Sequence, residues 1–80
     1  MIRQVYLITK NRVIVRAHME KSDCLADIPS ADELEAYATE AFAERFPKVD
    51  TSQWDMSCKL RTAPQRYPGT WGVVELALTA

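Results

Sequence analysis

Residues 30–47 read SADELEAYATEAFAERFP, and this stretch predicts a helix with well-marked ends. The Ser30 hydroxyl can accept a hydrogen bond from the Glu33 amide while the Glu33 carboxylate reaches back, which is the pattern of a capping box. Pro47 disfavours helical geometry at Phe46 and therefore ends the helix there. One apolar stripe follows the helical spacing, made of Leu34, Ala38, Ala41, Phe42 and Phe46, with Tyr37 at its border. The helix must therefore pack this stripe against another element.

Two segments before the helix predict a β-hairpin. Residues 4–10 read QVYLITK and residues 13–19 read VIVRAHM, and both are rich in β-branched and aromatic side chains. Asn11, in the polar break between them, can adopt a left-handed conformation. We expect a register in which one face carries Val5, Leu7, Val13, Val15 and Ala17. The opposite face then carries Tyr6, Ile8, Ile14, Arg16 and His18.

Two segments after the helix also predict strands. Residues 54–62 alternate with a period of two, which is typical of a half-buried strand. One side carries Trp54, Met56, Cys58 and Leu60, and the other carries Asp55, Ser57, Lys59 and Arg61. Pro68-Gly69 predicts a type II turn before the last strand, residues 71–79. In that strand Val74, Leu76 and Leu78 are expected to face the helix, with Val73, Glu75 and Ala77 opposite.

The element order β-β-α-β-β predicts an α+β fold, a four-stranded antiparallel sheet with one helix packed on one face. We expect a single domain spanning residues 1–80. Its predicted core consists of Val5, Leu7, Val13, Val15, Leu34, Ala38, Ala41, Phe42, Trp54, Met56, Leu60, Val74, Leu76 and Leu78. The other sheet face is left bare.

The composition is that of a globular protein, with 48% hydrophobic and 26% charged residues. No apolar run approaches the roughly 20 residues that span a bilayer. The opening Met1-Ile2-Arg3-Gln4 lacks the apolar stretch of a secretion signal, so we expect a cytoplasmic protein and no membrane partner.

Residues with catalytic or cofactor chemistry are few, and no enzyme is predicted. Gly69 and Gly72 are the only glycines and neither opens a helix, which argues against a phosphate-binding loop. His18 is the only histidine, and Cys24 and Cys58 have no metal-ligand spacing, so neither a metal nor another cofactor is expected. We expect two reduced thiols, with Cys58 in the core and on the sheet face opposite His18. No catalytic residue is therefore assigned.

Charge is distributed unevenly, although the net charge is only -1. Residues 1–21 are mostly basic, and residues 22–46 carry most of the carboxylates. The predicted helix presents Asp32, Glu33, Glu35, Glu40 and Glu44 to solvent. A solvated acidic face explains them better than a metal site, because no histidine is spaced to complete one. The first hypothesis is therefore a non-enzymatic protein-binding module, an inhibitor or adaptor whose acidic helix meets a basic, nucleic-acid-binding groove and mimics phosphates.

In size and acidity the chain resembles the small proteins that phages and plasmids encode to inhibit host machinery, anti-CRISPR proteins among them. The resemblance is one of coarse character and assigns no residue a role.

The bare sheet face supports two alternative hypotheses. Tyr6, Arg16, His18, Lys59 and Arg61 would lie there, beside exposed Ile8, Ile14 and Val73. A single-stranded nucleic acid could stack on the aromatic side chains beside the cations, although the pI of about 5.7 argues against it. Alternatively, the apolar residues could form a structural homodimer or meet another protein.

Residues 65–71 form a second candidate surface, a loop that carries Arg66, Tyr67 and Trp71 beside a rigid turn. These side chains either form the tip of a binding loop, or Tyr67 and Trp71 fold back to cap the open end of the core. The second possibility is slightly favoured.

Overall fold

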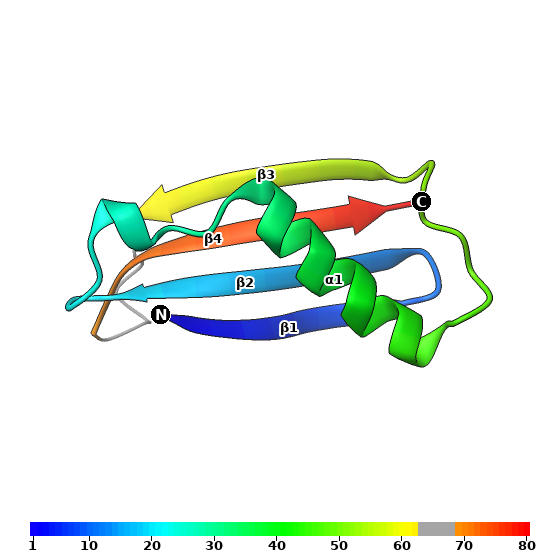
Figure 1. Cartoon of the computed structure of the whole chain (residues 1–80), viewed down its shortest axis with the longest axis horizontal. Coiled ribbons are helices and arrows are strands. Elements are labelled where there is room, and N and C mark those ends of the chain that lie inside the picture. The colour runs from blue at the N-terminus through cyan, green and yellow to red at the C-terminus, as the bar shows by residue number, and fades with distance from the viewer. Residues whose placement is uncertain (63–68) are drawn as a thin grey trace.

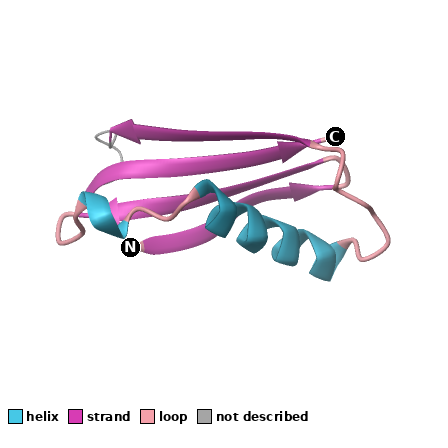
Figure 2. Cartoon of the chain, turned by 45° about the horizontal axis from the view of Figure 1, so that its top comes forward, coloured by secondary structure: helices cyan, strands magenta, loops and turns pink. Residues whose placement is uncertain are grey.

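The computed structural model of the chain describes residues 1–62 and 69–80, and for Thr62 it describes the backbone alone. Its elements are β1 (Ile2–Thr9), β2 (Arg12–Glu20), the short 3-10 helix η1 (Leu25–Asp27), α1 (Ala31–Arg45), β3 (Asp55–Thr62) and β4 (Thr70–Thr79). The strands form one antiparallel sheet in the order β1-β2-β4-β3, and α1 lies on one face of it (Figure 1 and Figure 2). The predicted α+β fold is confirmed, and η1 is an element that the sequence analysis missed.

The strand order reflects the long connection between β2 and β3. After β2 the chain passes through η1 and α1, and α1 ends beside β1. The loop of residues 46–54 then crosses to the far edge, where β3 forms, and β4 returns between β3 and β2 (Figure 1). As a result β2 and β4 are central strands with neighbours on both sides, while β1 and β3 are the two edges. This difference decides which predicted core residues are buried.

The predicted ends of α1 are confirmed. The Ser30 hydroxyl accepts a hydrogen bond from the Glu33 amide at 3.2 Å, and the Phe46 amide donates to the Phe42 carbonyl at 2.8 Å. The second half of the predicted capping box is wrong: the Glu33 carboxylate does not reach back to Ser30 but lies 3.7 Å from Nη2 of Arg3 on β1.

The core lies between α1 and the two central strands. Its buried members are Val13, Val15, Ala17, Met19, Leu34, Ala38, Phe42, Val74, Leu76 and Leu78. Phe42 packs edge-on against Trp54 with ring centroids 4.9 Å apart, so the loop before β3 closes one end of this layer. Fully burying a side chain of this size stabilises the fold by roughly 1.5–3 kcal/mol, which makes the helical stripe the main anchor of α1.

The predicted register of the first hairpin is wrong beyond Val5. A β-bulge interrupts β1, so that Val5 pairs with Val15, Leu7 with Ile14 and Ile8 with Val13. Because the extra residue, Tyr6, shifts the alternation, Leu7 leaves the core face and Ile8 joins it. Val5 keeps its predicted face but stays exposed at the sheet edge.

The connection of this hairpin consists of Lys10 and Asn11, between the paired residues Thr9 and Arg12. Asn11 is not left-handed, since no described residue other than glycine has a positive φ. Its side-chain oxygen accepts from the Thr9 hydroxyl at 3.0 Å, and its carbonyl accepts from the Ala80 amide at 2.9 Å. These bonds hold the turn.

The predicted burial of β3 is wrong, although its predicted face is correct. Met56, Cys58 and Leu60 pair with core residues of β4, yet Met56 is 45% and Leu60 53% exposed, and Cys58 is exposed as well. A helix is about 10 Å across and strands lie about 4.8 Å apart, so one helix cannot cover four strands. α1 contacts β1, β2 and β4 and leaves most of β3 bare (Figure 1).

The sheet face away from α1 is less bare than predicted. Ile14, Val73 and His18 are only 5%, 6% and 8% exposed. All three lie on the central strands β2 and β4. On the same face Arg16 donates from Nε to Glu75 at 2.9 Å, and its guanidinium lies 3.6 Å from the centre of the Tyr6 ring. The exposed apolar patch expected here is therefore absent, because Ile14 and Val73 are buried and Ile8 lies on the α1 face.

Candidate functional site

A shallow groove runs between α1 and the edge strand β1. Val5, Tyr37, Glu40, Ala41 and Glu44 line it, and its volume is about 300 Å³. Tyr37 and Ala41 are half-buried, whereas Glu40 and Glu44 are exposed. This α1/β1 groove therefore combines apolar surface with two carboxylates, and it suits a chain that offers both cationic and aliphatic groups.

The acidic side chains of α1 do not form one continuous face. At about 100° per residue, Glu33, Glu40 and Glu44 fall within about 40° of one another around the helix, on the side toward β1. Asp32 and Glu35 fall on the other flank. The structure thus brings three of the five predicted carboxylates together along the groove side and separates the other two.

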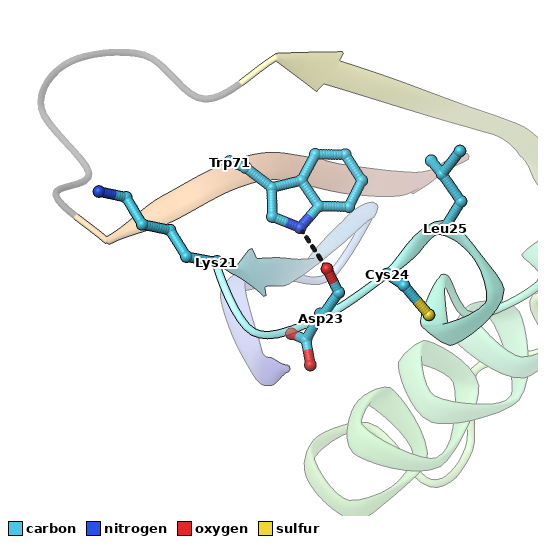
Figure 3. Close-up of a pocket in the computed structure, with 5 residues that line it drawn as sticks. All are labelled: Lys21, Asp23, Cys24, Leu25 and Trp71. Atoms are coloured by element: carbon cyan, nitrogen blue, oxygen red, sulfur yellow. Dashed lines mark hydrogen bonds between the residues drawn. The ribbon is translucent and has the colours of Figure 1, made fainter.

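A second pocket, of about 360 Å³, lies beside η1 at the opposite end of the sheet from the β1–β2 turn (Figure 3). It is lined by Lys21, Asp23, Cys24, Leu25 and Trp71. Nε1 of Trp71 donates to the Asp23 carbonyl at 3.1 Å, and the indole packs against the core. Trp71 therefore folds back, as the favoured alternative predicted, while Arg66 and Tyr67 lie outside the described residues.

Two carboxylates near this pocket are held by hydrogen bonds. Asp23 lies 2.8 Å from the Met1 ammonium and accepts from the Glu20 amide, and these bonds, in that order, lower the pKa of Asp23. Asp27 accepts from the backbone amide and then from the thiol of Cys24, which lowers the pKa of Asp27. The Cys24 thiol thus serves as a hydrogen-bond donor in the cap of η1.

Groups able to do chemistry lie apart from one another in the described part of the chain. His18 is buried on the face away from α1, Cys58 lies on the α1 side of β3, and Cys24 is the N-cap residue of η1. Partial desolvation raises the pKa of the Cys58 thiol. No three His, Cys, Asp or Glu side chains among the described residues are grouped to hold a metal ion. Within the same residues, no helix is long and apolar enough to cross a membrane.

The residues predicted for the open sheet face divide into two groups. Tyr6 and Arg16 meet near β1, and the Arg16 guanidinium is engaged by Glu75. Lys59 and Arg61 lie on β3, where Lys59 is paired with Glu75 and Arg61 with Val73, and both are exposed. His18, the fifth predicted residue, is buried. The five predicted residues therefore do not form one continuous cationic platform, since the Glu75 carboxylate lies between the two exposed groups.

Sequence reasoning missed the α1/β1 groove, the pocket beside η1 and the bare β3 side chains. Each depends on how distant segments pack together, so none has a local signal in the sequence. The chain matches no protein-family model, no curated protein and no solved structure. A functional argument therefore rests on the geometry of these surfaces.

Proposed function

We propose that the protein is a non-enzymatic protein-binding module that takes a basic segment of a partner protein into the α1/β1 groove. In this proposal it acts as an inhibitor or adaptor, of the kind that phages and mobile elements encode, by occupying the partner's surface. The supporting observation is that Glu40 and Glu44 border a groove lined by Tyr37 and Val5.

The side chains of the groove suit arginine and lysine in two ways. Glu40 and Glu44 are one helical turn apart, about 6 Å along the axis, so each can take a separate cationic group. The aliphatic stems of those cations can lie on Val5 and Ala41, and a guanidinium can stack on the Tyr37 ring. Surfaces that bind nucleic acid are rich in such cations, which makes a nucleic-acid-binding protein the best-suited partner.

The experiment compares two charge reversals of equal size on the two flanks of α1. Glu40→Lys with Glu44→Lys should abolish binding of a fluorescent arginine- and leucine-containing peptide, because it places cations beside the groove. Asp32→Lys with Glu35→Lys changes the net charge equally but lies on the other flank, so binding should fall only through long-range electrostatics. Circular dichroism checks that both variants keep their helix.

Two measurements test the proposal: the salt dependence of wild-type binding and the relative binding losses of the two variants. Raising the salt concentration should weaken binding to the wild type, since exposed ion pairs are screened. Equal losses in the two variants would contradict a specific groove, because they would show that only total charge matters. Retained binding in the Glu40 and Glu44 variant would contradict the proposal directly.

The nucleic-acid hypothesis has weaker support from the geometry. A base stacking on Tyr6 would have to displace the Arg16 guanidinium, which is also bonded to Glu75, and His18 is buried. Titration of labelled single-stranded DNA and RNA at low salt tests this alternative, because phosphate contacts are strongest there. We expect no binding.

A further inference from the structure

The edge strand β3 pairs with β4 on one side and, within the described part of the chain, has no neighbouring strand on the other side. Every residue from Asp55 to Arg61 is exposed, on both faces of the sheet, and its pairing with β4 is free of register shifts. On the α1 side the strand presents Met56, Cys58 and Leu60, which we call the β3 apolar strip. A long, regular, partly apolar edge offers its backbone groups to another strand.

We infer that a second copy of this chain pairs with β3 in antiparallel fashion about a two-fold axis at Cys58, joining the two sheets into one continuous sheet. In this register Met56 lies opposite Leu60 of the second copy, and Cys58 lies opposite its own counterpart. Asp55 lies opposite Arg61 of the second copy, and the two-fold axis repeats each pair.

The faces of the strand match in this register. Residues directly opposite in an antiparallel pair share a face, so the β3 apolar strip meets the same strip of the second copy. The polar side then pairs Asp55 with Arg61 and Ser57 with Lys59, without opposing two like charges. Within the described residues Asp55, Lys59 and Arg61 form no ion pair in the single chain, so these charges are available.

Neighbouring registers fit less well. A shift by one residue sets the apolar strip of one copy against the polar side of the other. Centring the axis on Lys59 opposes two lysines and takes Asp55 away from Arg61. Centring it on Ser57 still pairs Asp55 with Lys59, but it places Leu60 opposite Trp54, which lies outside the strand and packs on Phe42. The axis at Cys58 alone uses the strand from Asp55 to Arg61.

The pairing does not depend on the proposed function, because it uses the opposite edge of the sheet from the α1/β1 groove. Each copy would keep its groove at the outer edge of the joined sheet. A dimer would therefore present two grooves, which raises the effective affinity for a partner with two basic segments.

A charge swap tests the pairing. Asp55→Arg and Arg61→Asp should each shift the equilibrium from dimer toward monomer. Each change places like charges opposite each other at positions 55 and 61, and the two-fold axis repeats this repulsion at both ends of the paired strands. The double variant restores opposite charges and should restore the dimer. Asp55 and Arg61 are six residues apart on one strand, about 20 Å, so they cannot compensate each other within one chain. Sedimentation equilibrium up to millimolar concentration measures the masses.

Thiol cross-linking provides an independent measurement of the register. In a Cys24→Ser background a short bismaleimide at about pH 8 should join Cys58 to its counterpart, since the thiolate reacts. The matched Cys58→Ser variant, which retains Cys24, should stay uncrosslinked. A monomeric wild type at millimolar concentration overturns the inference. So does a dimer that the single charge variants leave intact, or a double variant that remains monomeric.

Discussion

β1 and β3 are the two edges of the same sheet, yet their environments differ. β1 has a bulge at Tyr6, contacts α1, and is tethered by the Arg3–Glu33 pair and by the Met1 ammonium, which lies 2.8 Å from Asp23. β3 is regular, exposed on both faces and largely uncovered by α1. A bulge and a covering helix are two ways in which proteins protect an edge from pairing. The comparison suggests that β1 is protected as an edge and β3 is available for pairing.

The largest expected effect comes from removing the anchor of α1. Phe42→Ala should lower the free energy of unfolding by about 3–5 kcal/mol, because it leaves a cavity under the helix. Leu60→Ala on β3 is the matched control, since Leu60 was also predicted to be buried but is 53% exposed. Its effect in the monomer should stay within about 0.5 kcal/mol. Urea denaturation at low protein concentration measures both, and equal losses would contradict the described exposure of β3.

An intermediate effect is expected at Glu75, which pairs in register with Arg16 on one side and Lys59 on the other. Among the residues that the structure describes, Arg16 alone forms an ion pair with Glu75, and both of those side chains are mostly buried. Glu75→Ala should therefore destabilise the fold by about 1–2 kcal/mol. Lys59→Ala should change the unfolding free energy by less than about 0.5 kcal/mol. Equal losses of unfolding free energy in Lys59→Ala and Glu75→Ala would contradict the view that Glu75 interacts with Arg16 and not with Lys59.

The smallest effect is a pH dependence from the tether that holds the start of β1. Its lowered pKa means that Asp23 stabilises the fold above its unfolded pKa of about 3.9, and this contribution is lost as the pH falls through the folded value. The pKa of the Met1 ammonium is raised, first by Asp23, so its contribution is complete below about pH 8 and is lost as the pH rises through the folded value.

The variant Asp23→Asn isolates this tether. The difference in unfolding free energy between wild type and Asp23→Asn should be constant between about pH 4 and pH 8 and should shrink on both sides. Thermal melts across that range measure it. A difference that is the same at every pH would show that Asp23 acts through hydrogen bonds that do not depend on its charge.

Local signals in the sequence were sufficient to predict α1 and the four strands, but not η1 or the bulge in β1. The Ser30 cap and Pro47 mark the ends of α1, and the stripe through Leu34, Ala38 and Phe42 identifies its buried side. The alternation of residues 55–62 assigns the faces of β3 correctly. These features depend on residues that are close together in the sequence, so one amino-acid sequence is enough to predict them.

The tertiary structure was needed to learn which sheet residues α1 covers and in which order the strands lie. Alternation shows that Met56 and Leu60 share a face, but only the position of α1 over β1, β2 and β4 shows that this face is uncovered at β3. Likewise, the bulge at Tyr6 exchanges Leu7 and Ile8, and the central position of β2 and β4 buries Ile14 and Val73. The physical reason is that burial depends on which distant segments pack together, whereas the direction of a side chain depends on its own backbone.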